Sequence, residues 1–332
     1  MKPKFITINK ISRIAILALI IGVLSSFFNF GIISVFFSVI MPIIFVINFI
    51  IAIYGLIKKK YHYLIGVIIF FLCYNLFFQF SLNTNIKTKD SISLISYNVR
   101  SFKQPVHSDS QQNAITEIKK IVDSINPDIL LLQESSYKEG LRIKGYSNVF
   151  LGYRKDVQKT LLTIYSKYPI INKGFIDFSD TYNNAIFADL KIKQDTVRIY
   201  NTHLQSFVFA PHIIADKYND YNYLSNLNST ISKQVEQAKL VKNHASKSNS
   251  KVIICGDFNA TSYSQPYRIL KKELNDSYVS NGNGFGATYS LLRYPLRLDY
   301  FLSDKQIEVL SHKNFDFNLS DHEPIYIKFK IR

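Results

Sequence analysis

The feature that most constrains the fold of this chain is the apolar character of its first 80 residues. Three apolar stretches run from about residue 14 to 30, 33 to 57 and 62 to 80. Crossing the hydrocarbon core of a bilayer takes roughly 20 helical residues, with a range of ~17–25. All three stretches reach this range, and none shows a polar face at helical spacing. We therefore predict three transmembrane α-helices.

A cleaved signal peptide is the alternative for the first stretch, because basic residues precede it, as in secretory signals. However, no small-residue cleavage site separates it from the next apolar run, and two further runs follow directly. We therefore expect a membrane domain over residues 1–81 and a short polar linker over 82–91. The lipid bilayer is the expected partner, and no obligate protein partner is evident.

The basic residues of the membrane domain predict its orientation. Residues 1–90 contain nine Lys and Arg but a single carboxylate, Asp90, and the basic residues include the amino terminus and the Lys58–Lys60 loop. Basic flanks of transmembrane helices stay in the cytoplasm. With three crossings, the rest of the chain would then lie on the other side. We expect a multi-pass protein of the cell membrane with an extracytoplasmic domain.

Residues 92–332 have the composition of an ordinary soluble domain with a mild excess of basic residues. This balance suits an anionic substrate or an anionic membrane surface. The two cysteines, Cys73 and Cys255, both lie in apolar runs. We expect them to be small buried hydrophobic residues rather than a disulfide or a metal pair.

Apolar runs of strand length alternate with helical segments in this domain, which predicts an α/β or α+β fold. The expected helices are 111–125, 230–246 and 264–272. Residues 207–229 show no clear period and are expected to form a long loop, either a membrane-facing lip or a plain surface loop. The expected strands are 92–98, 128–133, 160–166, 185–191, 195–201, 251–256, 298–302 and 323–330.

Polar residues of catalytic type occur where these strands begin or end. Groups mounted at one edge of a sheet can converge although they are far apart in sequence. Each residue taken alone is as well explained by a turn, a loop cap or a buried hydrogen bond. Their joint occurrence predicts an active site. The residues are Asn98, Glu134, His203, Asp257, Asn259, Asp299, Asp321 and His322.

These residue types suit hydrolysis of a phosphoester. Mg²⁺ takes oxygen ligands and keeps several waters, so Glu134 can hold it with support from the carboxamide oxygen of Asn98. Asp257 can orient or deprotonate the attacking water, while Asn259, His203 and His322 can donate to phosphoryl oxygens. Asp299 can accept from the second nitrogen of His322 and fix its tautomer. Mn²⁺ remains an alternative metal.

The motifs ISYNVR, PDILLLQE, TIYSKYPI, IYNTHLQS, IICGDFNA, RLDYFLSD and LSDHEPI occur in this order. Together they resemble the endonuclease/exonuclease/phosphatase superfamily, the family of deoxyribonuclease I, over most of residues 92–330. The resemblance implies a four-layered α/β sandwich with its site at one edge of the sheets. It also implies a metal held by Glu134, with Asn98 close by and Asp321 as a further metal-side carboxylate.

By the same resemblance, Asp257 and Asn259 match the water-activating Asp and phosphate-binding Asn, and Asp299 and His322 match the Asp–His pair. His203 matches the histidine of branches with an NTH motif, such as sphingomyelinases. We expect a membrane-anchored phosphoesterase acting on a lipid or other extracytoplasmic substrate. An extracytoplasmic nuclease and a non-catalytic anchored binding module are the alternatives.

Overall fold

The computed structural model describes residues 8–73, 81–82, 91–102, 111–136, 143–155, 157–206, 221–291 and 293–332. The chain divides into two compact units, and each is described by itself. The first unit comprises Met1–Phe78, Val208–Val235 and Thr261–Arg268. The second comprises Gln79–Phe207, Glu236–Ala260 and Ile269–Arg332.

The first unit begins with two apolar helices, α1 (Ile8–Ser25) and α2 (Ile32–Ile57), each long and apolar enough to cross a membrane. Most residues that α1 buries are small, and they include Ala15 and Gly22. Asn48 of α2 donates to the carbonyl of Ala15 at 3.1 Å. Large apolar side chains such as Ile14 and Phe49 face outward and are more than half exposed. Small and polar residues at the contacts between helices, with large apolar residues on the outer surface, are typical of helices packed in lipid.

The third predicted span, residues 62–80, lies only partly within the described residues. Its described part is a 3₁₀ helix, η1 (Tyr61–Leu64), followed by α3 (Ile65–Leu72). At 1.5–2.0 Å per residue these segments reach roughly 20 Å, short of a hydrocarbon core. Among the described residues, two helices are therefore long enough to cross a membrane, rather than the three that we predicted.

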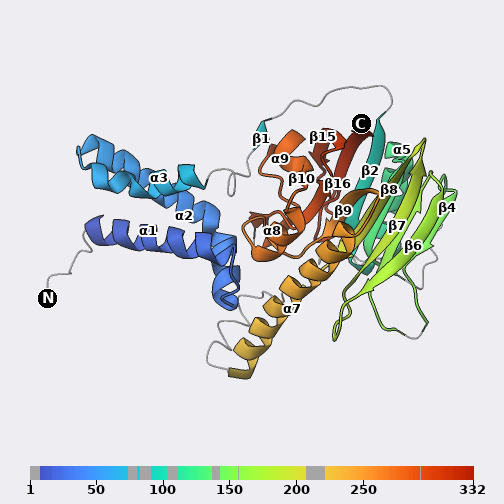
Figure 1. Ribbon diagram of the computed structural model, residues 1–332, viewed down its shortest axis with the longest axis horizontal. Helices are drawn as coiled ribbons and strands as arrows, with labels where there is room; N and C mark the ends of the chain where they lie inside the picture. The colour runs from blue at the N-terminus through green and yellow to red at the C-terminus, as the bar shows by residue number, and fades with distance from the viewer. Residues whose placement is uncertain are drawn as a thin grey trace. The chain divides into compact units, whose positions relative to one another are not determined.

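The second unit consists of two six-stranded sheets packed face to face (Figure 1). The first sheet has the order β15 (Ile307–Asn314), β16 (Ile325–Ile331), β2 (Ile92–Asn98), β3 (Ile129–Ser135), β5 (Leu161–Ser166), β4 (Asn148–Leu151). The second has the order β10 (Asn275–Asp276), β14 (Asp299–Ser303), β9 (Lys251–Asp257), β8 (Asp195–His203), β7 (Asn184–Ile192), β6 (Ile170–Asp177). Two short ribbons pair β1 (Ser81–Leu82) with β11 (Asn283–Gly284), and β12 (Tyr289–Leu291) with β13 (Tyr294–Leu296).

The main hydrophobic core lies between the two sheets. Alternate residues of each strand point to one face, so Leu94 and Leu131 of the first sheet meet Ile199 and Ile253 of the second. All four side chains are fully buried. Cys255 also belongs to this core as a free thiol, which confirms its prediction as a buried hydrophobic residue.

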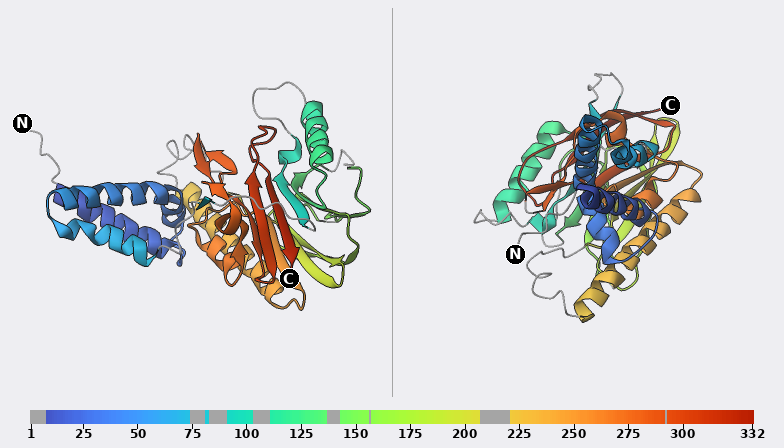
Figure 2. Two further views of the ribbon diagram at one scale, coloured as in Figure 1. Left: turned by 90° about the horizontal axis from the view of Figure 1, so that it is seen from above. Right: turned by 90° about the vertical axis from the view of Figure 1, so that its left-hand side faces the viewer.

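Helices cover the outer faces of both sheets (Figure 2). Helix α5 (Gln111–Ile125) packs Ile118 and Val122 against the outer face of the first sheet. The carboxyl-terminal half of α7 (Tyr221–Ser246) covers the second sheet, where the His244 ring lies 4.8 Å from that of Phe187. The order helix, sheet, sheet, helix confirms the predicted four-layered α/β sandwich. The shorter helices are η2 (Arg100–Phe102), α8 (Gln265–Lys271) and α9 (Ser277–Asn281).

The strands and helices predicted within residues 92–332 recur within two or three residues, apart from the start of α7. The first apolar helix, predicted at about 14–30, lies at Ile8–Ser25. Helix α7 already begins at Tyr221, so the predicted loop over 207–229 is wrong for its last nine residues. Residues 207–220 lie outside the described part of the chain. Strands β4, β6 and β15 were not predicted, because they carry polar residues among their apolar ones.

Candidate active site

Polar side chains replace apolar ones at one end of the core between the sheets. Leu94 and Asn98 share one face of β2, as Ile199 and His203 share one face of β8, because side chains alternate along a strand. Strands β2 and β3 are parallel, and so are β8 and β9. Their carboxyl ends therefore meet at one edge, where His203 pairs directly with Asp257.

Glu134 reaches this site because β3 is irregular at its end. Regular alternation would point Glu134 toward the helix side, together with Leu132. Instead, the pairing of β3 with β5 shifts register between Leu132 and Ser135, and Glu134 has a φ of 52°. Such a bulge turns a side chain to a new direction and is common next to active sites. The Oε1 atom of Glu134 thereby lies 3.2 Å from Nδ2 of Asn98.

Asn98 connects two carboxylates. Its Oδ1 accepts the backbone N–H of Arg100 at 3.0 Å, which fixes the orientation of the amide. Its Nδ2 then donates to Glu134 and, at 3.0 Å, to Oδ2 of Asp257. In this arrangement Asn98 positions the two carboxylates through its nitrogen, while its oxygen is engaged by the backbone.

The backbone around Asp257 is shaped by its neighbours. Gly256 has a φ of 128°, and a Cβ there would lie 2.2 Å from the carbonyl oxygen of Thr202, so only glycine fits. Oδ1 of the buried Asp257 accepts the backbone N–H of Asn259 at 2.7 Å. Asn259 in turn donates from Nδ2 to the carbonyl of Leu204 at 3.0 Å. Asp257 and Asn259 are thus held beside one another.

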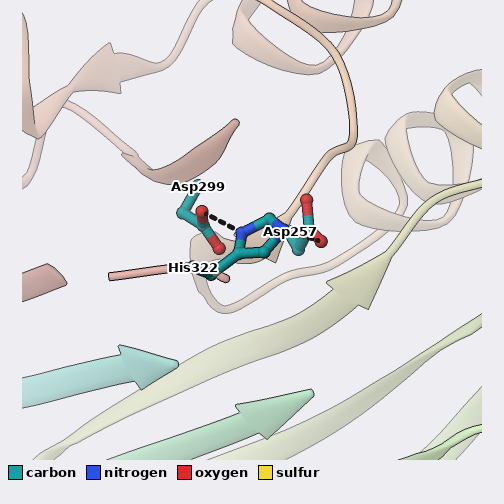
Figure 3. A group of neighbouring side chains, drawn as sticks. All are labelled: Asp257, Asp299 and His322. Carbon is teal, nitrogen blue, oxygen red and sulfur yellow. Dashed lines mark hydrogen bonds and ion pairs between the residues drawn. The ribbon is translucent and has the colours of Figure 1, made fainter. Parts of the chain in front are cut away.

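Asp299 and His322 form a buried pair that faces Asp257 (Figure 3). The Nδ1 atom of His322 lies 2.8 Å from Oδ2 of Asp299, and its Nε2 lies 3.6 Å from Oδ2 of Asp257. The Tyr289 ring flanks His322, with 5.0 Å between the ring centroids. Thr288 accepts the backbone N–H of Asp299 through its hydroxyl at 3.2 Å. Because a carboxylate only accepts, Nδ1 of His322 carries a proton.

This group of charges favours an imidazolium at His322. Burial by itself would lower the pKa of His322, but the negative charges of Asp257 and Asp299 and the hydrogen bond to Asp299 outweigh it. The pKa of His322 is raised to about 10. Burial raises the pKa of Asp257, while the charge of His322 opposes this effect. At neutral pH, a positive His322 therefore lies between two carboxylates.

His203 is held in a single tautomer. Asn183 donates from Nδ2 to the carbonyl of Leu204 at 3.0 Å, so its amide nitrogen also faces Nδ1 of His203 at 3.2 Å. Nδ1 then accepts, and the proton of the neutral ring is on Nε2. Nε2 is buried without a hydrogen-bond partner among the described residues, 3.5 Å from Oε1 of Glu134 and 3.7 Å from Oδ2 of Asp257.

The donor atoms at this edge suit a hard divalent cation. Asp257, Asp299 and His322 each offer a ligand atom, and these atoms lie within 4.8 Å of one another. Nδ1 of His322 is already engaged by Asp299, however, so we assign this pair to proton and charge chemistry. Glu134, whose side chain is 29% exposed, offers a more accessible carboxylate. Oxygen-rich sites of this kind favour Mg²⁺ or Mn²⁺.

Asp321 lies at the rim of the site rather than inside it. Its carboxylate is 37% exposed and pairs with Nε of Arg100 at 3.5 Å. The structure thus brings Asn98, Glu134, His203, Asp257, Asp299 and His322 into one linked group. Asn259 adjoins them through Asp257.

A layer of buried polar side chains, which was not predicted from the sequence, lies next to the site. Gln133 donates to Oδ1 of Asn201 at 2.7 Å and to Ser96 at 3.1 Å, and all three side chains are fully buried. Asn201 donates to the carbonyls of Leu132 and Thr163. Asn183 was missed as well, because it follows a turn and not a recognised strand. Alternation along β3 and β8 is the only sequence signal that points to Gln133 and Asn201.

Comparison with known proteins gives a family match and a shared fold. The family model described as "Endonuclease/Exonuclease/phosphatase family" matches residues 95–322. No curated protein sequence matches the chain.

Solved structures at low sequence identity share the fold. An endonuclease/exonuclease/phosphatase from Bacteroides vulgatus aligns with a TM-score of 0.58 at 15% identity, over 74% of this chain and 100% of its own. A humanized D. rerio TDP2 aligns with a TM-score of 0.56 at 18% identity, over 73% and 100%. The human Nocturnin catalytic domain with bound sulfate aligns with a TM-score of 0.55 at 18% identity, over 75% and 98%.

Proposed function

Because the chain belongs to the endonuclease/exonuclease/phosphatase family and is therefore a phosphoester hydrolase, we propose that it uses a divalent cation and a water to cleave its substrate. The observation that carries this proposal is the buried Asp299–His322–Asp257 arrangement, with His322 positively charged between two carboxylates. A buried positive group beside a buried base is suited to a phosphoryl group, which gains negative charge during attack.

Each residue of the site has its own role in the proposed hydrolysis. Glu134, with Asn98 behind it and Asp321 at the rim, would hold Mg²⁺ or Mn²⁺, which supplies positive charge next to the phosphoryl group. Asp257 orients the attacking water and accepts its proton. Imidazolium His322, fixed by Asp299, donates to a phosphoryl oxygen. His203 has its Nε2 proton directed toward the same space, and Asn259 lies next to the base.

The test uses the full-length chain in detergent, with Mg²⁺, Mn²⁺ or a chelator. The probes are a generic phosphodiester, sphingomyelin, phosphatidylinositol phosphates, plasmid DNA and RNA. We expect metal-dependent hydrolysis that falls ~10²–10⁴-fold in Asp257→Ala and His322→Ala, the usual scale of acid–base and electrostatic effects. If none of the probes is cleaved, or if both variants keep full activity, the proposal is wrong.

We further propose that the substrate is a lipid or another extracytoplasmic ester. The exposed apolar surface of α1 and α2 supports attachment to a membrane. The basic amino terminus and the basic loop after α2 support a cytoplasmic location for those segments. Cleavage of plasmid DNA or RNA in preference to lipids in the same assay would favour the alternative of an extracytoplasmic nuclease.

A further inference from the structure

The helix bundle of the first unit, formed by α1, α2 and α3, includes a segment that follows the candidate active site in the sequence. Residues Thr261–Arg268 belong to this unit. Thr261 comes only two positions after Asn259, which adjoins Asp257 in the site. The contacts that hold this segment therefore also restrain the backbone next to Asn259.

Pro42 leaves one backbone carbonyl of α2 without its helical partner. In a regular α-helix the N–H of residue 42 would donate to the carbonyl of Ser38, but proline has no N–H. The hydroxyl of Thr261 donates to this carbonyl at 3.1 Å, and both side chains are buried. An unpaired carbonyl is costly in a membrane helix, and Ser or Thr hydroxyls are among the groups that satisfy it. Thr261 thus completes the hydrogen bonding of α2.

The ring of Tyr263 packs into the apolar part of the bundle. Its centroid lies 6.1 Å from that of Phe45 in α2. Tyr263 also packs against a buried cluster made of Leu19, Met41 and Ile44. This cluster contains residues of both α1 and α2, so Tyr263 joins the apolar packing between the two helices.

The other end of the segment is fixed to the turn after α1. Gln265 donates from Nε2 to the carbonyl of Phe27 at 2.8 Å. The guanidinium of Arg268 lies 4.5 Å from the centroid of the Phe27 ring, where the electrons of the ring attract a cation. The segment is therefore held to the bundle at both ends by directional polar contacts.

The first half of α7 holds the turn between α1 and α2 as well. Asn228 accepts the backbone N–H of Ile32 at 2.9 Å and so satisfies a free donor at the start of α2. Gly31 allows this approach, because a Cβ there would lie 2.2 Å from Oδ1 of Asn228. Asn29 donates to the hydroxyl of Ser232 at 3.2 Å. Two segments that continue directly into the second unit are thus built into the helix bundle.

We propose that the helix bundle positions Asn259 for catalysis by holding residues 261–268, so that the membrane helices contribute to the active site as well as attaching it. The inference rests on the proposed function. Asn259 has a φ of 47°, a left-handed conformation that persists only where the surrounding contacts hold it. Thr261, bonded to α2, holds the chain on one side of Asn259.

Full-length variants in proteoliposomes test the positioning role, with the probe that the wild-type chain cleaves. Thr261→Val nearly keeps the shape of the side chain but removes the donor to Ser38. We expect kcat to fall ~10-fold, on the scale of an unmade buried hydrogen bond, with little change in KM. Thr261→Ser should restore kcat. The matched control Thr116→Val changes an exposed threonine of α5 and should leave kcat unchanged.

Pro42→Ala tests whether the carbonyl of Ser38 is the group that Thr261 serves. This substitution restores a backbone N–H at position 42, which can pair with the carbonyl. In the Pro42→Ala background, Thr261→Val should therefore lower kcat by less than ~3-fold, because the two sites are coupled.

Docking of the segment is measured without turnover. The chain contains no tryptophan, so Tyr263→Trp provides a single fluorophore. In proteoliposomes we expect its emission to be blue-shifted and shielded from iodide. The reference is Tyr182→Trp, at a side chain of the second unit that is 66% exposed. Adding Thr261→Val should increase the iodide quenching of the Tyr263→Trp emission.

Equal quenching of the Tyr263→Trp and Tyr182→Trp emission would mean that residues 261–268 are not docked, and would overturn the proposal. A kcat that Thr261→Val leaves unchanged, or lowers equally with and without Pro42→Ala, would also overturn it. If the wild-type chain cleaves none of the probes, the proposed function fails. A shielded Tyr263→Trp emission that depends on Thr261 would then still support the docked segment.

Discussion

At the scale of single residues, the charge on His322 depends on its two carboxylate neighbours, and this dependence can be tested at Asp299. The raised pKa of His322, about 10, keeps the imidazolium present at neutral pH. Asp299→Asn removes one negative charge and replaces the carboxylate at the 2.8 Å hydrogen bond with a neutral amide. We expect kcat to fall ~10²–10⁴-fold, as for loss of an electrostatic or acid–base contribution.

The pH dependence of kcat in the same variant distinguishes a change in the charge of His322 from a general disruption of the site. A raised pKa means that the protonated form persists until the pH rises through that value, so wild-type activity should fall on the alkaline side near pH 10. In Asp299→Asn the alkaline limb of the kcat profile should move toward neutral pH. An unmoved limb would show that His322 is not the group whose charge matters.

Asn183 offers a second test, because it affects the reaction only by orienting His203. Asn183→Leu removes the donor that keeps Nδ1 of His203 as an acceptor, so the Nε2 proton is no longer fixed toward the site. We expect kcat to fall ~10-fold or more, within the range for groups that orient a catalytic side chain, with little change in KM. Asn172→Leu, which removes a hydrogen bond to Asp189 on the second sheet, is the control and should keep full activity. A change confined to KM would contradict the assignment.

The site residues named from the sequence were those that lie where recognisable apolar strands begin or end. Asp257 follows a strongly apolar run, and this is enough to place it at the edge of a sheet. Asn183 gave no such signal, because its partner His203 lies 20 positions away and is brought near only by the pairing of β7 with β8. The orientation of the Glu134 side chain toward Asn98 also could not be predicted from the sequence, because a regular strand would point this side chain the other way.

At the scale of elements, the apolar interior of the sheets was predictable and their polar edges were not. Strands β2, β3 and β9 are buried over nearly their whole length, so continuous apolar runs revealed them. Strand β6 lies at the edge of its sheet and buries only one of its eight side chains, which leaves little apolar pattern. The start of α7 was missed because residues 221–229 are rich in Asn, Ser and Tyr, which are weak helix formers.

Strand β15 and helix α9 are joined by a buried histidine that should make the fold sensitive to acid. Nδ1 of His312 lies 2.7 Å from the hydroxyl of Ser277, and burial lowers the pKa of His312 from 6.5 to about 4. The unfolded chain therefore binds a proton at a higher pH than the folded chain does. The resulting stability is complete above pH 6.5 and is lost as the pH falls toward 4.

Between pH 6.5 and 5 the loss from His312 amounts to about 2 kcal/mol, at about 1.4 kcal/mol for each pH unit. Thermal unfolding followed by circular dichroism at pH 7 and pH 5 measures it. We expect the difference in Tm between the two pH values to be smaller in His312→Asn than in the wild-type chain. Equal differences would mean that His312 is already protonated in the folded state or does not contribute.

At the scale of the whole molecule, the side of the membrane on which the catalytic unit lies depends on the number of crossings. The amino terminus and the Lys58–Lys60 loop are basic and are therefore expected in the cytoplasm. If α1 and α2 are the only crossings, the catalytic unit would also lie in the cytoplasm. A third crossing through residues 62–80 would place it on the other side. The proposed extracytoplasmic site therefore requires a third crossing.

Single cysteines measure this orientation directly. Cys255 provides little background, because burial raises the pKa of its thiol to about 12 and the thiolate is the reactive form; Cys73 is replaced by serine. In intact spheroplasts, a membrane-impermeant maleimide should label Lys305→Cys but should label Lys59→Cys only after lysis, since the two positions lie on opposite sides. Labelling of neither position before lysis would mean an even number of crossings and a cytoplasmic site. The substrate would then have to be sought among cytoplasmic phosphoesters, while the chemistry of Asp257, Asp299 and His322 would be unaffected.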